Sequence, residues 1–264
     1  MDRVANVYRT TTIALVAAVA ATAFSLAARP AEAAEAAVAN GKTIVLVHGA
    51  FADGSSWNKV IPTLQQRGYK VVAVQNPLTS LADDVAATNR VIDAQKGDVV
   101  LVGHSWGGVV ITEAGNNPKV KSLVYVAAFA PEAGQSVADA SKSYAPAPGL
   151  KNLVADSGGF LTLTDADFKT YFAPDVSPAE VKLMAATQGP VQSKVFGEKV
   201  GDSAAWKSKP SWFVLAQKDQ MIPPTQQADD ARKIHATVVK VNASHVPMVS
   251  QPKAVADAIL AAAK

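Results

Sequence analysis

Short runs of apolar, mostly β-branched residues alternate along the chain with stretches whose apolar residues recur every three or four positions. Runs that are apolar almost throughout are typical of parallel strands, because helices cover both faces of such a sheet. The stretches between them have helical spacing, as in Trp57, Val60 and Leu64. The alternation predicts an α/β fold with a doubly wound, mostly parallel sheet. The strand pattern occurs in residues 42–47, 70–75, 98–103, 120–127, 211–216 and 237–241.

The alternation stops in the second half of the chain, between residues 130 and 209. This stretch contains many prolines and glycines, no clear strand, and short helical patterns such as residues 177–186. A long insertion between two sheet strands is typical of a lid over one edge of the sheet. We therefore predict a helical lid at about 130–209. A separate small domain is the alternative, although the stretch has few core residues for independent folding.

The first 33 residues have the character of a targeting signal. Arg3 and Arg9 precede an uncharged, Ala-rich run at residues 11–28, and Ala31-Glu32-Ala33 offers a small-x-small cleavage site. A retained membrane anchor is the alternative, but the run is barely long enough to span a hydrocarbon core of roughly 30 Å. The sequence thus predicts a signal peptide at 1–33, a mature α/β domain at 34–264, no stable membrane anchor, and a periplasmic or secreted protein.

The amino-acid composition excludes several kinds of site and partner. The 264 residues include no cysteine, which excludes disulfides, thiolate metal sites, iron–sulfur clusters and cysteine nucleophiles. The net charge of +3 comes without a basic run or interleaved aromatic residues, so no nucleic-acid partner is expected. A hydrophobic content of 49% excludes a disordered chain.

The segment Gly103-His104-Ser105-Trp106-Gly107 carries the strongest chemical signal. It follows an expected buried strand and precedes a helical pattern, which is the strand–turn–helix setting of a nucleophile elbow. The strained turn presents a serine hydroxyl at the start of a helix, where backbone N–H groups meet developing negative charge. Ser105 is therefore the predicted nucleophile, whereas an ordinary glycine-rich turn is the alternative.

A serine needs a base, and the chain contains four histidines. His48 lies in a turn that ends a strand, His104 lies inside the elbow, and His235 ends a helical pattern. His245 follows the last strand, in a loop expected at the carboxyl edge of the sheet. By elimination, His245 is the predicted base.

The orienting acid is expected one strand earlier. Asp219 follows the strand at 211–216, and the strand before that ends without a carboxylate. Asp202 and Glu198 are weaker alternatives because they lie in the predicted lid. The order Ser105, Asp219, His245 is that of α/β-hydrolases, not of chymotrypsin or subtilisin.

An oxyanion hole requires two backbone donors near the serine. The N–H of Trp106 directly follows the predicted nucleophile. Ala50 lies in the turn after the first strand, where Gly49 leaves room for the backbone. We predict Ala50 and Trp106 as the donors, with a purely structural turn as the alternative for Ala50.

Four segments together resemble the α/β-hydrolase superfamily, and more closely the bacterial esterases similar to plant methylesterases and hydroxynitrile lyases. They are VLVHGAFADGSSW, VLVGHSWGG, AQKDQMIPP and ASHVPMVSQP. The resemblance implies a serine hydrolase without cofactor or metal, with Ser105, Asp219 and His245 as its triad. In the lyase branch a lysine typically follows the catalytic histidine, whereas Val246 stands here.

These observations favour hydrolysis of a small, fairly apolar carboxylic ester through an acyl-enzyme. Phe51 and Trp57 are expected to line the substrate pocket, with Gln188 reaching it from the lid. For Trp57 a position in the core is the alternative. One alternative is a lyase or a cofactor-free peroxidase-like activity on the same triad. Another is a non-catalytic small-molecule-binding protein of this fold, although such a protein has no need of all three triad residues.

Overall fold

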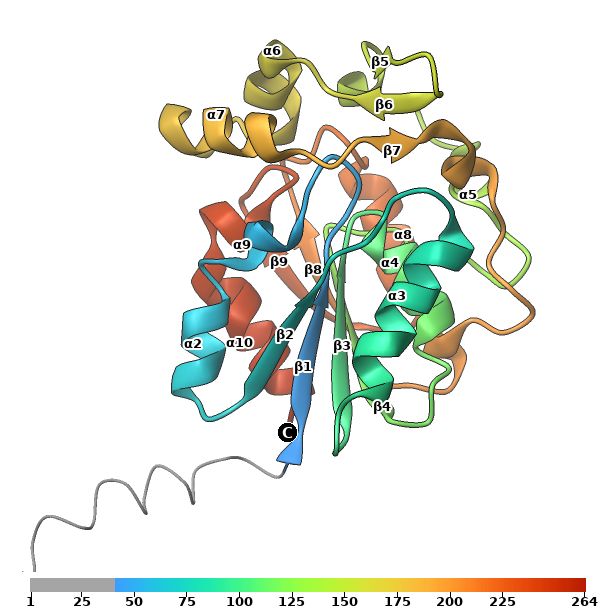
Figure 1. Cartoon of the computed structure of the whole chain (residues 1–264), viewed down its shortest axis with the longest axis vertical. Coiled ribbons are helices and arrows are strands. Elements are labelled where there is room, and N and C mark those ends of the chain that lie inside the picture. Colours follow the sequence, from blue (N-terminus) through green and yellow to red (C-terminus); the bar gives the residue numbers. More distant parts are fainter. Residues whose placement is uncertain (1–40) are drawn as a thin grey trace, which may run out of the picture. The chain divides into compact units, whose positions relative to one another are not determined.

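The computed structural model describes residues 41–264, so the predicted signal peptide at 1–33 lies outside the described part. The main sheet has six strands in the order β2-β1-β3-β4-β8-β9, all paired in parallel (Figure 1). This confirms the predicted doubly wound α/β fold. The strands are β1 (Thr43–Val47), β2 (Lys70–Val74), β3 (Val99–His104), β4 (Val120–Val126), β8 (Ser211–Ala216) and β9 (Thr237–Val241).

The order in which the chain adds strands to the sheet reverses at β1, while all strands stay parallel. The chain starts in β1, moves outward to β2, and returns to β3 on the other side of β1. Val47 at the end of β1 pairs with Gly103 of β3, so the segments beginning at His48 and Ser105 leave the sheet side by side. Such a reversal opens a crevice at the carboxyl ends of the strands, where open α/β sheets bind their ligands.

Helices cover both faces of the sheet, with α3 and α4 on one side and α2 and α10 on the other (Figure 1). Ser80 caps α3, because its side chain accepts a hydrogen bond from the N–H of Asp83. Within residues 41–264, every helix falls short of the length and apolar composition that a membrane crossing requires. The helices of this layer are α2 (Ile61–Gln66), α3 (Leu81–Asp93), α4 (Gly107–Ala114), α8 (Pro224–Lys233), α9 (Pro247–Ser250) and α10 (Pro252–Ala262), preceded by the 3₁₀ turn η2 (Gly54–Trp57).

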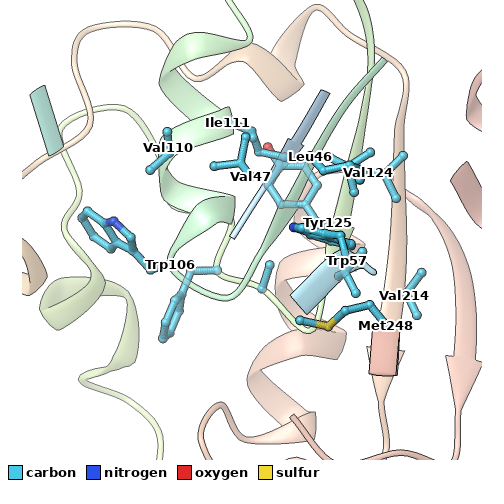
Figure 2. Close-up of a cluster of buried hydrophobic side chains, with 14 of the residues drawn as sticks. Leu46, Val47, Trp57, Trp106, Val110, Ile111, Val124, Tyr125, Val214 and Met248 are labelled. Atoms are coloured by element: carbon cyan, nitrogen blue, oxygen red, sulfur yellow. The ribbon is translucent and has the colours of Figure 1, made fainter. Parts of the chain in front are cut away.

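The core lies between the sheet and these helices, and its largest side chains are fully buried (Figure 2). Trp57 and Trp106 fill space near the carboxyl ends of the strands, and Tyr125 extends from β4. The Tyr125 hydroxyl lies 3.0 Å from Thr112 Oγ1. Burial raises the pKa of Tyr125, so this phenol stays neutral and serves packing.

Residues 130–209, which we call the insert, lie above the carboxyl ends of the strands (Figure 1). The sequence pattern indicated no strand here, and this was wrong: β5, β6 and β7 form a small antiparallel sheet. Strands of two or three residues are too short to show an alternating pattern. The insert contains α5 (Val137–Ser141), η3 (Pro148–Leu150), β5 (Val154–Ala155), β6 (Phe160–Thr162), α6 (Asp165–Asp167), η4 (Phe168–Phe172), α7 (Pro178–Thr187), β7 (Val191–Gln192), η5 (Ser193–Gly197) and η6 (Ala205–Lys207).

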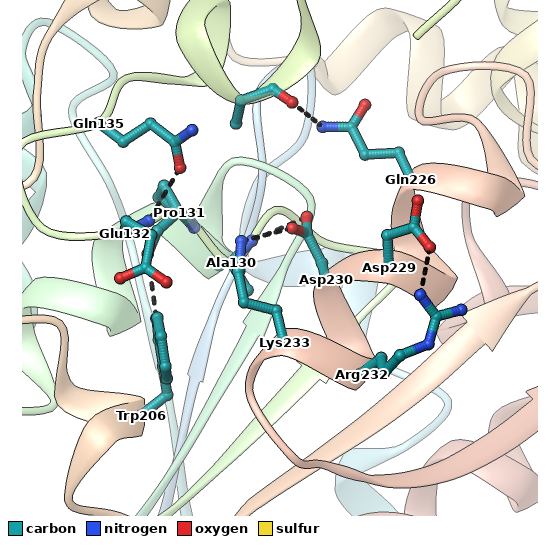
Figure 3. A network of polar contacts seen from close by, with 12 residues as sticks. Ala130, Pro131, Glu132, Gln135, Trp206, Gln226, Asp229, Asp230, Arg232 and Lys233 are labelled. Atoms are coloured by element: carbon teal, nitrogen blue, oxygen red, sulfur yellow. Dashed lines mark hydrogen bonds and ion pairs between the residues drawn. The ribbon is translucent and has the colours of Figure 1, made fainter. Parts of the chain in front are cut away.

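Polar contacts tie the two ends of the insert to each other and to α8 (Figure 3). The indole N–H of Trp206 donates to the carbonyl of Pro131 at 3.0 Å. Asp230 accepts a hydrogen bond from the N–H of Ala130 at 3.4 Å and pairs with Lys233 at 2.7 Å. The insert is therefore anchored where it leaves and rejoins the sheet, and its middle portion faces the strand ends.

Candidate active site

Ser105 occupies a sharp turn between β3 and α4. It has a φ of 52°, in the left-handed region that residues with a side chain rarely adopt. The turn depends on glycine, because a Cβ on Gly103 would overlap the carbonyl oxygen of Gly107. A strained residue held by packing at a strand end is characteristic of functional sites. The local structure therefore agrees with a nucleophile elbow.

His245 and Asp219 meet at the carboxyl ends of β9 and β8. His245 Nδ1 lies 2.8 Å from Asp219 Oδ2, and both side chains are buried. Since the carboxylate only accepts, Nδ1 carries the proton and Nε2 remains an acceptor. The other oxygen of Asp219 accepts the backbone N–H groups of Met221 at 2.7 Å and Ile222 at 3.0 Å, which fix the orientation of the side chain.

Ser105 and His245 line the same cavity. Within residues 41–264, no hydrogen bond joins the Ser105 hydroxyl to the His245 ring. Catalytic hydrogen bonds are often long without substrate and tighten in the bound complex. The structure thus places the Ser105 hydroxyl and the His245 imidazole at one cavity, with the Asp219 carboxylate bound to the imidazole.

Two backbone N–H groups near Ser105 donate no hydrogen bond within the described part of the chain. They belong to Ala50, after β1, and to Trp106, at the start of α4. Ala50 lines the cavity. A Cβ on Gly49 would lie 2.6 Å from the Cβ of Ser105, so the loop of Ala50 passes directly beside the serine. Both N–H groups are therefore free to donate hydrogen bonds to an oxyanion.

Two further histidines hydrogen-bond the backbone of this site. His48 Nε2 accepts the N–H of Asn76 at 2.9 Å, and its Nδ1 donates to the carbonyl of Gly49 at the same distance. His104 Nε2 donates to the backbone carbonyl of His245 at 2.8 Å. Burial lowers the pKa of both rings, far below the usual range for His104, so both stay neutral. His48 shapes the Ala50 loop, and His104 fixes the backbone of His245.

The cavity has a volume of about 340 Å³, and its walls are mostly apolar. The strand-end loops supply Ser105 and His245, while the insert supplies much of the remaining wall. Among residues 41–264, Lys151 is the only lining side chain with a permanent charge, and it is exposed to solvent. Its apolar lining includes Phe129, Val137, Leu153, Phe196, Met221 and Ile222.

Comparison with known proteins identifies the family of this chain. Residues 44–258 match the Alpha/beta hydrolase family. The chain belongs to this family. Among relatives of this α/β-hydrolase, a pyrethroid hydrolase of Sphingobium wenxiniae is 28% identical over 82% of this chain and 85% of its own. Methylesterase 2 of Arabidopsis thaliana is 25% identical over 83% of this chain and 95% of its own.

The fold agrees with solved structures as well. The crystal structure of polyneuridine aldehyde esterase superposes with a TM-score of 0.74 and 21% identity, covering 84% of this α/β-hydrolase chain and 99% of the esterase. At this identity the likeness concerns the fold alone. The α/β-hydrolase architecture expected from the sequence is thereby confirmed.

Of the three predicted substrate-contacting residues, only Phe51 lines the cavity. Trp57 takes the alternative position considered for it, in the core: its side chain is fully buried and stands edge-on to the ring of His104. Gln188 does not line this cavity either. Its amide pairs with the N–H and the carbonyl of Leu163, at 2.9 and 3.0 Å, and so extends the hydrogen bonding within the insert.

Sequence reasoning missed Asp84, which supports the elbow from α3. Its carboxylate accepts the indole N–H of Trp106 at 2.7 Å and the N–H of Leu78 at 2.8 Å. Burial raises the pKa of Asp84 to about 6. The sequence does contain a sign of this role, because the spacing places Asp84 on the same helical face as Leu81 and Thr88, which are both buried. A carboxylate on an apolar helix face needs a partner.

Gln227 was missed as well. Its amide N–H donates to Asp219 Oδ2 at 2.8 Å, and its amide oxygen accepts the N–H of Ala216 at 3.0 Å. The side chain is fully buried. Gln227 thus joins the end of β8 to the acid that follows it. Its sequence position on a polar helix gave no sign of this role.

Proposed function

We propose that this protein is a serine esterase that hydrolyses small, apolar carboxylic esters through an acyl-enzyme. One observation carries the proposal: the buried hydrogen bond between His245 and Asp219 leaves Nε2 of the histidine as an acceptor in the cavity that Ser105 lines. A serine with ordinary reactivity requires such a base. The Ser-His-Asp arrangement on this fold then supports acyl transfer.

The mechanism uses groups already in position. His245 takes the proton of Ser105 as Oγ attacks the ester carbonyl, and the imidazolium is stabilised by Asp219. The N–H groups of Ala50 and Trp106 donate to the oxyanion of the tetrahedral intermediate. His245 then passes the proton to the departing alcohol. A water activated by the same ring hydrolyses the acyl-enzyme and regenerates Ser105.

The cavity wall supports an apolar substrate. Beside Ser105, the lining is formed by Phe129, Phe196, Met221 and other apolar side chains, and a polar acyl group would lose its hydration there without a partner. The names of the relatives, a methylesterase and a pyrethroid hydrolase, also support ester hydrolysis. The volume of about 340 Å³ is at the lower end of the range for small-molecule sites.

A panel of p-nitrophenyl and methyl esters, combined with a fluorophosphonate probe, tests the proposal. Wild-type protein should hydrolyse short apolar esters and take up one probe molecule per chain, and Ser105→Ala should do neither. Absence of both activities in folded wild-type protein would refute the proposal. Mandelonitrile belongs in the same panel, since Val246 is buried and offers no charge for a departing cyanide. Cyanide release that matches ester turnover would favour the lyase alternative.

A further inference from the structure

One carboxylate of the insert accepts hydrogen bonds from the loop that carries the predicted base. Asp175 follows η4, and its Oδ2 accepts the backbone N–H of Ser244 at 2.9 Å. Its Oδ1 accepts the hydroxyl of the same serine. Ser244 directly precedes His245 and is 1% exposed. Its hydroxyl also lies 3.3 Å from the carbonyl oxygen of Phe172, so the acceptors of this serine all belong to the insert.

The neighbouring residues of the insert reach the same loop and the loop of the acid. The ring of Phe172 stands edge-on to the His245 ring, with centroids 5.2 Å apart. Two residues earlier, the carbonyl of Thr170 accepts the side-chain amide of Gln220 at 3.2 Å. Gln220 directly follows Asp219. Residues 170–175 therefore touch both strand-end loops that supply the acid and the base.

We propose that Asp175 is a positioning residue for His245. Asp219 holds the His245 ring at Nδ1, and His104 holds the backbone carbonyl of His245. Neither contact holds the backbone that precedes His245. Asp175 supplies that hold through Ser244. Catalytic groups must be kept within about 0.5 Å of productive geometry. The proposal rests on the proposed esterase function and extends it by giving the insert a part in aligning the base.

Substitution separates this role from ordinary folding support. Asp175→Asn keeps the size of the side chain, but its amide can accept at only one of the two atoms that now contact Ser244. The control is Asp156→Asn in the same insert. One oxygen of Asp156 accepts the N–H groups of Gly158 at 2.8 Å and Phe160 at 2.9 Å, and the amide oxygen of asparagine can keep both hydrogen bonds. Neither of those partners belongs to a triad loop.

We expect Asp175→Asn to lower kcat about tenfold or more while KM changes less than twofold, since binding walls are untouched. Asp156→Asn should keep kcat within about twofold of wild type. Ser244→Ala should lower kcat by a smaller factor than Asp175→Asn. The double variant should have the same kcat as Asp175→Asn alone, because the two changes remove the same contact. Melting temperatures verify that each variant is folded.

A second measurement does not depend on any substrate. The proton between His245 Nδ1 and Asp219 should give a downfield proton NMR signal in wild type and in Asp156→Asn, and this signal should broaden or vanish in Asp175→Asn. An unchanged signal with unchanged kcat would overturn the positioning role, as would an equal loss in the Asp156 control. If wild type lacks esterase activity and probe labelling, the proposed function fails, while the NMR comparison still decides whether Asp175 positions His245.

Discussion

The sheet and the insert are held together in different ways. In the sheet, whole strands such as β1 and β3 are buried on both faces, and their apolar runs specify structure by pattern. In the insert, side chains satisfy backbone groups one at a time: Ser136 and Asp139 form a capping box, and Gln188 pairs with Leu163. The sheet therefore provides rigid attachment points, and the insert provides a surface that can vary without disturbing them.

The two regions also divide the active site. Ser105, Asp219 and His245 all follow strands of the sheet, whereas much of the cavity wall belongs to the insert. Precise chemistry is best placed on rigid elements, and substrate contacts on loops. If this division holds, changes in the sheet loops should affect turnover, and changes in the insert wall should affect which ester binds.

Removal of the nucleophile gives the largest expected effect. Ser105→Ala should lower kcat for short p-nitrophenyl esters by roughly 10⁶-fold, because the acyl-enzyme can no longer form. The fold should persist, as the loss of one hydroxyl in the turn leaves the strand and helix intact. Initial rates with active-site titration measure the effect. A reduction of only a few-fold would mean that another residue is the nucleophile.

Removal of the charge on the acid comes next. Asp219→Asn should lower kcat by roughly 10⁴-fold, because an amide can donate to Nδ1 and favour the wrong histidine tautomer. Asp202→Asn is the control, since Asp202 is exposed and lies in the insert. Steady-state kinetics and melting temperatures of both variants provide the comparison. A greater loss in the Asp202 variant would show that the acid has been misassigned.

The contrast between sheet and insert also explains what the sequence could predict. Strand ends could be located from apolar runs, so Ser105, Asp219 and His245 could be placed at one edge before any coordinates were known. Trp57 could not be assigned to the core or to a pocket, because an aromatic residue near a strand end has the same pattern in both positions. The pairing of Gln188 with Leu163 could not be predicted, because the two residues lie 25 positions apart. Such pairing leaves no periodic trace.

A buried carboxylate beneath the elbow should make stability depend on pH. In the folded chain Asp84 has a pKa of about 6, above its ordinary value of 3.8. The folded state thus keeps the Asp84 proton to higher pH than the unfolded state does. Protonated Asp84 therefore stabilises the fold below about pH 4, and this stabilisation is lost as the pH rises through 6. The contribution is on the order of 3 kcal/mol of unfolding free energy.

Urea unfolding at pH 4 and pH 7 tests this. The fall in unfolding free energy between the two values should be smaller in Asp84→Asn than in wild type. Burial also raises the pKa of Asp230, but that residue contributes equally to both proteins and cancels in the difference. An identical fall in both proteins would contradict the proposed titration of Asp84.

The smallest effect concerns the wall that the insert contributes. Leu150 lines the cavity and is 40% exposed, so it is placed to cover the outer part of a bound ester. Leu150→Ala removes apolar area that only longer acyl chains would reach, and each buried methylene is worth about 0.8 kcal/mol. KM for octanoate esters should rise about fivefold, with acetate esters unchanged. Leu183→Ala is the matched control, because Leu183 is an exposed leucine of the insert that does not line this cavity. If kcat for acetate esters falls by as large a factor as KM for octanoate esters rises, Leu150 affects turnover as well as binding. The division between sheet and insert would then not hold at this residue.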